Sequence, residues 1–142
     1  MKQRRLTSLK TLFLIALVCF AGLVSCKKQA SKTDTPESTV ENYLKAIDVF
    51  DFEQANKYVI KNENTDQVIN NIEWYYNSMN DVERKNYLSG KRKSYFIKRI
   101  PKTANETTII AINKDGVYAF GITFNVIKKE NTWLIENIQA DD

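Results

Sequence analysis

The chain has 142 residues, with 21 Lys and Arg against 17 Asp and Glu, two Cys and no His. Four of the cations and none of the acids lie in residues 1–25, so the rest of the chain is neutral overall, and the sequence pI of about 9.0 is no argument for a nucleic-acid partner. The lack of histidine excludes a histidine general base and a histidine-centred metal site, and we expect no cofactor and no metal.

Residues 1–25 have the features of an export signal. A cationic head is followed by an apolar segment, residues 11–22, that is too short to span a bilayer comfortably. The segment ends in Leu23-Val24-Ser25-Cys26, which resembles the lipobox of bacterial lipoproteins. This resemblance implies that the signal peptide is removed and that Cys26 carries fatty acyl chains such as palmitate. The alternatives are an uncleaved membrane anchor and an ordinary signal peptide in which Cys26 has no role.

Residues 26–34 lack large apolar side chains beyond Cys26 and are predicted to form a flexible tether. Lys27 and Lys28 follow Cys26 directly. The lipoprotein resemblance implies that an acidic residue at this position would favour retention at the inner membrane or export to the cell surface. We therefore expect a lipid-anchored protein of the cell envelope, at the outer membrane and facing the periplasm. With Cys19 in the signal and Cys26 lipidated, no thiol is left for a disulfide, a metal or a nucleophile.

Helical periodicity fills the first half of the predicted domain, residues 35–142. Thr35 caps a helix predicted over residues 36–49, which has one apolar stripe. Asp51 caps a short second helix, a third begins near Thr65, and residues 81–88 form a further helical stretch.

The second half changes to the alternating pattern of β-strands, which is rich in β-branched and aromatic residues. Four strands are predicted, over residues 95–100, 107–113, 117–129 and 132–138. Tight turns at residues 114–116 and 130–131 join them into an antiparallel meander. The expected fold class is α+β, with N-terminal helices packed on a curved antiparallel sheet of about four strands.

The segment from Thr35 to Val59, TPESTVENYLKAIDVFDFEQANKYV, together with the long aromatic strand and the last strand around Trp133, resembles small lipoproteins of the nuclear-transport-factor-2-like superfamily. The resemblance spans most of residues 35–138. It implies a conical α+β domain whose helices and sheet can enclose a pocket. It implies little about activity, because this fold serves enzymes, binding modules and dimerisation domains.

Inward-facing acids are scarce, which argues against catalysis. Isomerase-like relatives on this fold use a carboxylate base beside a tyrosine in an apolar pocket. Asp48 and Asp51 lie at a helix end, where a capping or solvated role is favoured, and Glu136 is expected to share a face with Leu134 and Ile138. We expect no catalytic residues; the alternative is a small-molecule pocket enzyme of the isomerase or hydratase type.

Two sets of side chains are candidates for binding. Aromatic residues either line a pocket for a small apolar ligand or simply fill the core; the candidates are Tyr43, Trp74, Tyr95, Tyr118, Phe120 and Trp133. A basic segment either meets lipid phosphates or an acidic envelope protein, or is a solvated loop and a protected edge strand; its candidates are Lys91, Arg92, Lys93, Lys98 and Arg99. A homodimer through the outer sheet face, near Thr123 and Asn125, is a further hypothesis. The expected function is therefore a non-catalytic ligand- or protein-binding domain held on a membrane by lipid.

Overall fold

The computed structural model describes residues 35–90, 92–114 and 121–140, all within the compact unit Lys32–Asp142. In this part of the chain, helices come first and strands follow: α2 (Pro36–Ile47), α3 (Phe52–Ala55), α4 (Glu63–Ser78), α5 (Asp81–Ser89), β1 (Tyr95–Pro101), β2 (Glu106–Asn113), β3 (Gly121–Lys129) and β4 (Thr132–Ala140). The strands pair in the order β1-β2-β3-β4, and all three pairings are antiparallel. The expected α+β class and the meander are confirmed. Residues 115–120, which hold most of the predicted turn and the start of the third predicted strand, lie outside the described residues.

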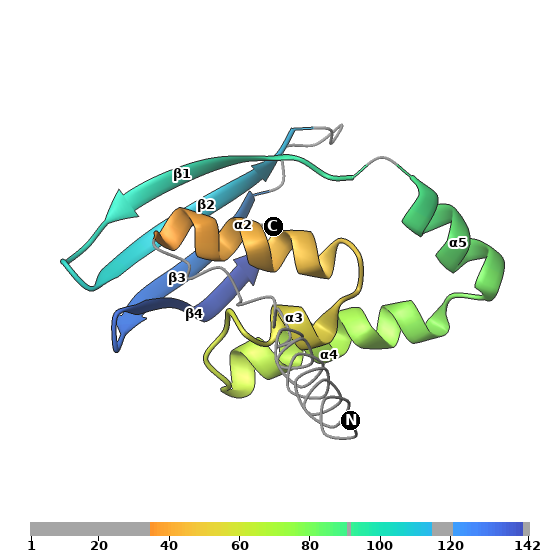
Figure 1. The fold of residues 1–142 in the computed structure, drawn as a ribbon, viewed down its shortest axis with the longest axis horizontal. Helices are drawn as coiled ribbons and strands as arrows, with labels where there is room; N and C mark the ends of the chain where they lie inside the picture. The colour runs from red at the N-terminus through yellow and green to blue at the C-terminus, as the bar shows by residue number, and fades with distance from the viewer. Residues whose placement is uncertain (1–34, 91, 115–120, 141–142) are drawn as a thin grey trace, which may run out of the picture. The chain divides into compact units, whose positions relative to one another are not determined.

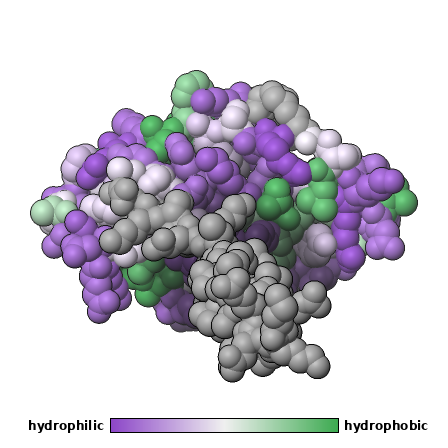
Figure 2. All heavy atoms as spheres, viewed as in Figure 1, coloured by the Kyte–Doolittle hydropathy of each residue, from purple (hydrophilic) through white to green (hydrophobic). Residues whose placement is uncertain are grey.

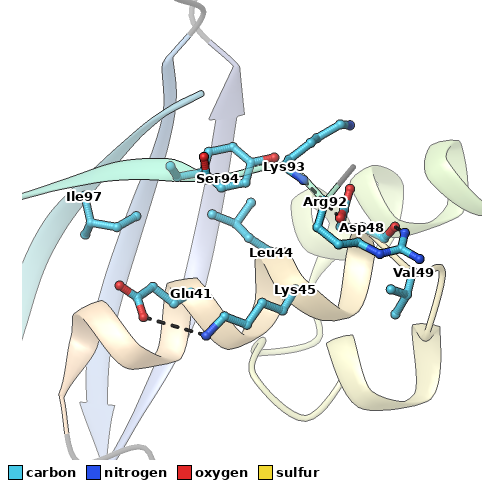
Figure 3. Close-up of a pocket in the computed structure, with 10 residues that line it drawn as sticks. Glu41, Leu44, Lys45, Asp48, Val49, Arg92, Lys93, Ser94 and Ile97 are labelled. Atoms are coloured by element: carbon cyan, nitrogen blue, oxygen red, sulfur yellow. Dashed lines mark hydrogen bonds and ion pairs between the residues drawn. The ribbon is translucent and has the colours of Figure 1, made fainter. Parts of the chain in front are cut away.

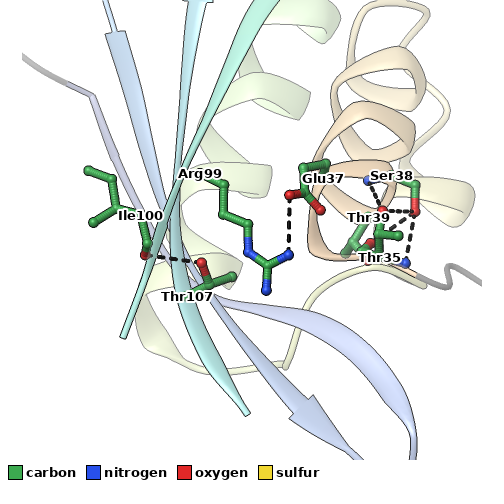
Figure 4. A network of polar contacts seen from close by, with 7 residues as sticks. All are labelled: Thr35, Glu37, Ser38, Thr39, Arg99, Ile100 and Thr107. Atoms are coloured by element: carbon green, nitrogen blue, oxygen red, sulfur yellow. Dashed lines mark hydrogen bonds and ion pairs between the residues drawn. The ribbon is translucent and has the colours of Figure 1, made fainter. Parts of the chain in front are cut away.

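Helix α2 lies across one face of the sheet, and α5 extends beyond the end of the sheet where β1 begins (Figure 1). The predicted cap at Thr35 is confirmed. The Thr35 hydroxyl accepts a hydrogen bond from the Ser38 backbone N–H at 3.1 Å, and the Ser38 hydroxyl accepts one from the Thr35 backbone N–H (Figure 4). The helix ends at Ile47 with Asp48 as its C-cap, two residues before the predicted end at Val49.

Two polar contacts fix β1 between α2 and β2 (Figure 4). The Arg99 guanidinium lies 3.4 Å from a Glu37 carboxylate oxygen in the first turn of α2. The Thr107 hydroxyl, which is fully buried, donates to the Ile100 carbonyl at 3.0 Å. The buried hydroxyl is therefore satisfied within the sheet.

Helix α4 begins at Glu63, so the predicted start near Thr65 is wrong by about two residues. Asn62 is the N-cap and Thr65 is its partner at the third helical position, each side chain bonding the other residue's backbone N–H. The Thr65 hydroxyl also donates to the Ile60 carbonyl at 2.6 Å. The predicted start of the helix comes too late because Thr65 is a favoured capping residue, but in the structure it lies inside the first turn.

The core lies between the helices and the inner face of the sheet. Phe124 is fully buried in β3, and its ring meets the Tyr43 ring of α2 edge to face at 5.9 Å. The buried hydrophobic residues that form this cluster all lie between Val40 and Ile138. The domain therefore carries its own core and is expected to fold without the preceding residues.

A β-bulge changes the expected pattern of β4. Asn125 pairs with Asn137 but Val126 pairs with Ile135, so Glu136 is an extra residue on the last strand. Ile135 and Ile138 are therefore both buried. The prediction that Leu134, Glu136 and Ile138 share one face is wrong, because the bulge interrupts the two-residue period between them.

The outer edge of β4 is covered by the segment between α3 and α4. The Ile60 N–H donates to the Ile135 carbonyl and the Ile135 N–H donates to the Tyr58 carbonyl, both at 2.8 Å. Asn64 then acts like a strand residue: its amide oxygen accepts from the Ile138 N–H at 2.8 Å and its amide nitrogen donates to the Ile138 carbonyl at 3.1 Å. These contacts remove an edge that would otherwise be open to another chain.

Replacing Asn64 by Ala leaves both backbone groups of Ile138 without this partner. We expect the free energy of unfolding to fall by about 1–3 kcal/mol, the usual cost of an unsatisfied buried polar group. Urea denaturation measures the loss, and hydrogen exchange at the Ile138 amide should become faster. Asn70→Ala, an exposed change on the same helix, is the control and should have little effect.

The exposed large hydrophobic residues are scattered along the chain: Val49, Trp74, Tyr75, Val82, Leu88, Phe96 and Ile100. On the face shown in Figure 2, hydrophobic residues form separate patches within a mostly hydrophilic surface. In the described ranges, no helix combines the length and the apolar character needed to cross a bilayer.

Candidate functional site

The second half of α2 and the start of β1 enclose a hollow of about 410 Å³, which we call the outer groove (Figure 3). Apolar side chains such as Leu44 and Ile97 form its floor, and charged side chains border it. Its lining residues are Glu41, Leu44, Lys45, Asp48, Val49, Arg92, Lys93, Ser94, Tyr95 and Ile97. Glu41 and Lys45 approach each other at 4.0 Å, one helical turn apart, on an exposed face where such a pair contributes little stability.

A second hollow of about 340 Å³, the inner cavity, adjoins the outer groove; the two share Leu44, Lys93 and Tyr95. It lies among α2, α4, α5 and the inner face of the sheet. Its lining is Tyr43, Leu44, Ile47, Phe50, Val68, Ile72, Tyr75, Tyr87, Lys93, Tyr95, Ile122, Phe124 and Ile138. Lys93 is the one charged side chain among these lining residues.

Asp48 joins the end of α2 to the segment between α5 and β1. One carboxylate oxygen accepts from the Tyr87 hydroxyl and the other from the Lys93 backbone N–H, each at 3.3 Å. The Asp48 carbonyl accepts from the Arg92 guanidinium at 3.3 Å, and Arg92 also donates to the Leu88 carbonyl. Of the two roles expected for Asp48, capping is confirmed, because Asp48 is the C-cap of α2. It is not solvated, since it is only 8% exposed, and its carboxylate positions the residues at the junction of the two hollows.

Helix α5 has no buried residue of its own. It is held mainly by Tyr87, whose ring lies 4.8 Å from the Phe50 ring, and by Arg84, whose guanidinium lies 4.8 Å above the Tyr76 ring. Phe50 has a positive φ of 57°, which turns the chain after α2 and brings its ring between Tyr76 and Tyr87. The wall of the inner cavity on this side therefore depends on ring stacking and on Asp48.

The Lys93 ammonium stays protonated at neutral pH. Partial burial alone would lower its pKa, but the hydrogen bond to Tyr87 and the charges of Tyr87, Tyr95 and Asp48 outweigh it, so the pKa lies above its ordinary value. Burial raises the pKa of Tyr95, which is therefore neutral. The mouth of the inner cavity thus presents one ammonium beside two tyrosine hydroxyls, and the Asp48 carboxylate binds one of these hydroxyls.

Tyr43 is 2% exposed, and its buried hydroxyl has no hydrogen-bond partner within the part of the chain that the structure describes. Burial raises the pKa of this phenol. A neutral hydroxyl in these surroundings is destabilising, because it has lost water without gaining a partner.

The structure separates the aromatic residues proposed from the sequence. Tyr43 and Tyr95 line the inner cavity. Trp133 is buried in the core, with the Lys128 ammonium 5.9 Å from its ring centre. Trp74 is 72% exposed on α4 and lines neither hollow. Tyr118 and Phe120 lie outside the described residues.

The basic candidates point in different directions. Lys91 lies outside the described residues, and Arg92 and Lys93 border the outer groove. Lys98 and Arg99 follow each other on β1, so their side chains lie on opposite faces of the sheet, and Arg99 is paired with Glu37. The described members therefore do not form one continuous patch.

Sequence reasoning missed the role of Asp48 and the position of Lys93, which of the described basic candidates is the one that lines the inner cavity. The sequence does mark Asp48, because it is an acidic residue directly after an apolar helical stripe. Its contacts with Tyr87 and Lys93, however, depend on the path of the chain through Phe50. In the described residues no group of three or more Asp, Glu, His or Cys is arranged to hold a metal ion. No protein-family model matches this chain, and no curated protein matches it in sequence.

Proposed function

We propose that this chain is a lipid-anchored protein of the cell envelope, attached through Cys26 at the outer membrane, whose domain binds a small apolar ligand in the inner cavity without chemical conversion. The observation that carries the binding proposal is the inner cavity itself: a hollow of about 340 Å³ lined almost wholly by aliphatic and aromatic side chains. Ligand sites are usually hollows of this kind, from about 300 to 1,000 Å³, with few polar groups. The order of helices and strands fits a nuclear-transport-factor-2-like cone, which we propose as the fold family.

Blocking the inner cavity tests the binding proposal. The neutral dye N-phenylnaphthylamine should bind saturably, with one molecule per chain and enhanced fluorescence. Ile122→Trp places a large side chain on the cavity wall and should weaken dye binding by about tenfold or more, equivalent to about 1.4 kcal/mol. Val82→Trp adds the same ring at an exposed position of α5 and should leave binding unchanged. Equal affinity in both variants would place the dye elsewhere.

The lipid anchor has its own test. Wild-type protein expressed in a bacterial host should partition with membranes, and its mass should correspond to a chain that begins at Cys26 and carries acyl groups. Cys26→Ser removes the thiol to which the acyl chains would be attached, so the mass of this variant should show no acyl groups. A wild-type mass that includes Met1 would contradict the proposal.

A second candidate is a pocket enzyme of the isomerase or hydratase type, favoured by the contact of the buried Asp48 carboxylate with the Tyr87 hydroxyl. We prefer binding because both carboxylate oxygens already accept hydrogen bonds that hold the chain. A homodimer through the outer sheet face would appear as a doubled mass in light scattering of the soluble domain, and a protein partner would be recovered with the chain by affinity capture from membranes. Turnover of an unsaturated carbonyl compound that Asp48→Asn abolishes would favour the enzyme.

A further inference from the structure

The chemistry of the inner cavity narrows the class of ligand. Twelve of its thirteen lining residues are uncharged, and the thirteenth is Lys93, at the border with the outer groove. An apolar body can therefore occupy the interior, while a charged group on the same molecule meets the Lys93 ammonium at the border with the outer groove, which Asp48 and Arg92 also line.

The Lys93 ammonium suits an anionic partner. Its pKa is raised above the ordinary value, so it is a full positive charge at neutral pH. None of the ion pairs between described residues involves Lys93. The nearby Asp48 carboxylate binds the backbone N–H of Lys93 and the hydroxyl of Tyr87 instead. The Asp48 carboxylate thus fixes the backbone of Lys93, while the Lys93 ammonium has the Tyr87 hydroxyl as its neighbour at the edge of the cavity.

We propose that the ligand is an apolar monocarboxylate, with its hydrocarbon body in the inner cavity and its carboxylate against the Lys93 ammonium. The neighbouring Tyr95 hydroxyl, on the same border, is a second donor for the carboxylate. Hydrogen bonds between ionised groups are roughly twice as strong as neutral ones, which makes this contact the main source of discrimination. This inference rests on the proposed function and names the ligand class of the same cavity.

Ligands with a positive charge, with several charges or with no charge are expected to bind more weakly than an apolar monocarboxylate. A cationic amphiphile would place its charge beside Lys93, and like charges at close range repel. A ligand with several charges would have to bury at least one of them among aliphatic and aromatic side chains, which is costly without a partner. A neutral alcohol of the same length fills the cavity but gains no charge-assisted contact.

The test compares decanoate, decanol and decyltrimethylammonium, titrated by calorimetry into a chain of residues 27–142, which holds the whole core. Wild-type protein should bind decanoate about tenfold or more tightly than decanol, and the cation most weakly. Lys93→Met should reduce decanoate affinity to that of decanol while leaving decanol affinity unchanged. Lys98→Met removes a cation at an exposed position of β1 and should retain the preference.

The outcomes separate the two proposals. If Lys93→Met keeps the preference for decanoate, or if wild-type protein binds decanol as tightly as decanoate, the monocarboxylate inference is wrong and the apolar binding site stands. If none of the three probes binds to wild-type protein and N-phenylnaphthylamine also fails to bind, the binding function itself is wrong. Binding of the cation in preference to decanoate would reverse the assigned charge.

Discussion

Replacing Phe124 by Ala is expected to lower the free energy of unfolding by about 3–5 kcal/mol, the usual cost of deleting a large buried aromatic ring. Phe124 is fully buried at the centre of β3 and meets Tyr43 edge to face. Its removal takes contacts from both the sheet and α2, because it lies where they meet. Since small domains are stable by only about 5–15 kcal/mol, this one change should remove a large fraction of the free energy of unfolding.

Urea denaturation monitored by circular dichroism measures the loss for Phe124→Ala. The matched control is Phe96→Ala, since Phe96 is 63% exposed on the edge strand β1. This variant should change the unfolding free energy by no more than about 0.5 kcal/mol, as surface substitutions usually do. Similar losses in both variants would mean that the inner face of the sheet is not the core.

Local patterns in the sequence were sufficient to predict the kinds of elements and their order. Thr35 and Pro36 define a helix start through backbone chemistry alone, and the alternation of β2 and β3 follows from one buried face. A meander also needs only short-range pairing, so neighbouring strands in the chain are neighbours in the sheet. These features depend on residues a few positions apart.

The features that the sequence did not predict depend on contacts between distant residues. The bulge at Glu136 is set by pairing with Asn125, and the cover of the β4 edge needs Asn64 beside Ile138. Trp74 and Phe124 are both large aromatics in apolar patterns, yet one is exposed and the other buried. The inner cavity likewise follows from how α4 and α5 pack, which no local pattern encodes.

The unpartnered hydroxyl of Tyr43 predicts an unusual result for Tyr43→Phe, which should stabilise the protein. Near pH 8 the variant should gain about 1 kcal/mol or more, because it removes a buried polar group that has no partner among the described residues. Tyr58→Phe is the matched control: its buried ring carries a hydroxyl that accepts a hydrogen bond from the Gln54 amide at 2.7 Å. That change should be neutral or destabilising.

The difference between wild type and Tyr43→Phe should also grow with pH. The folded protein holds the pKa of Tyr43 above its ordinary value of 10.0, so above about pH 10 the unfolded chain loses a proton that the folded chain keeps. Stability that depends on this proton is complete below pH 10 and falls as pH rises, by about 1.4 kcal/mol per pH unit for one group. The raised pKa values of Tyr95 and Lys93 also lower stability as pH rises, but they do so equally in wild type and in Tyr43→Phe. The difference in unfolding free energy between these two proteins therefore reports on Tyr43 alone. Urea denaturation between pH 8 and about pH 11 measures it, and parallel curves would show that the Tyr43 hydroxyl is solvated or paired in the folded state.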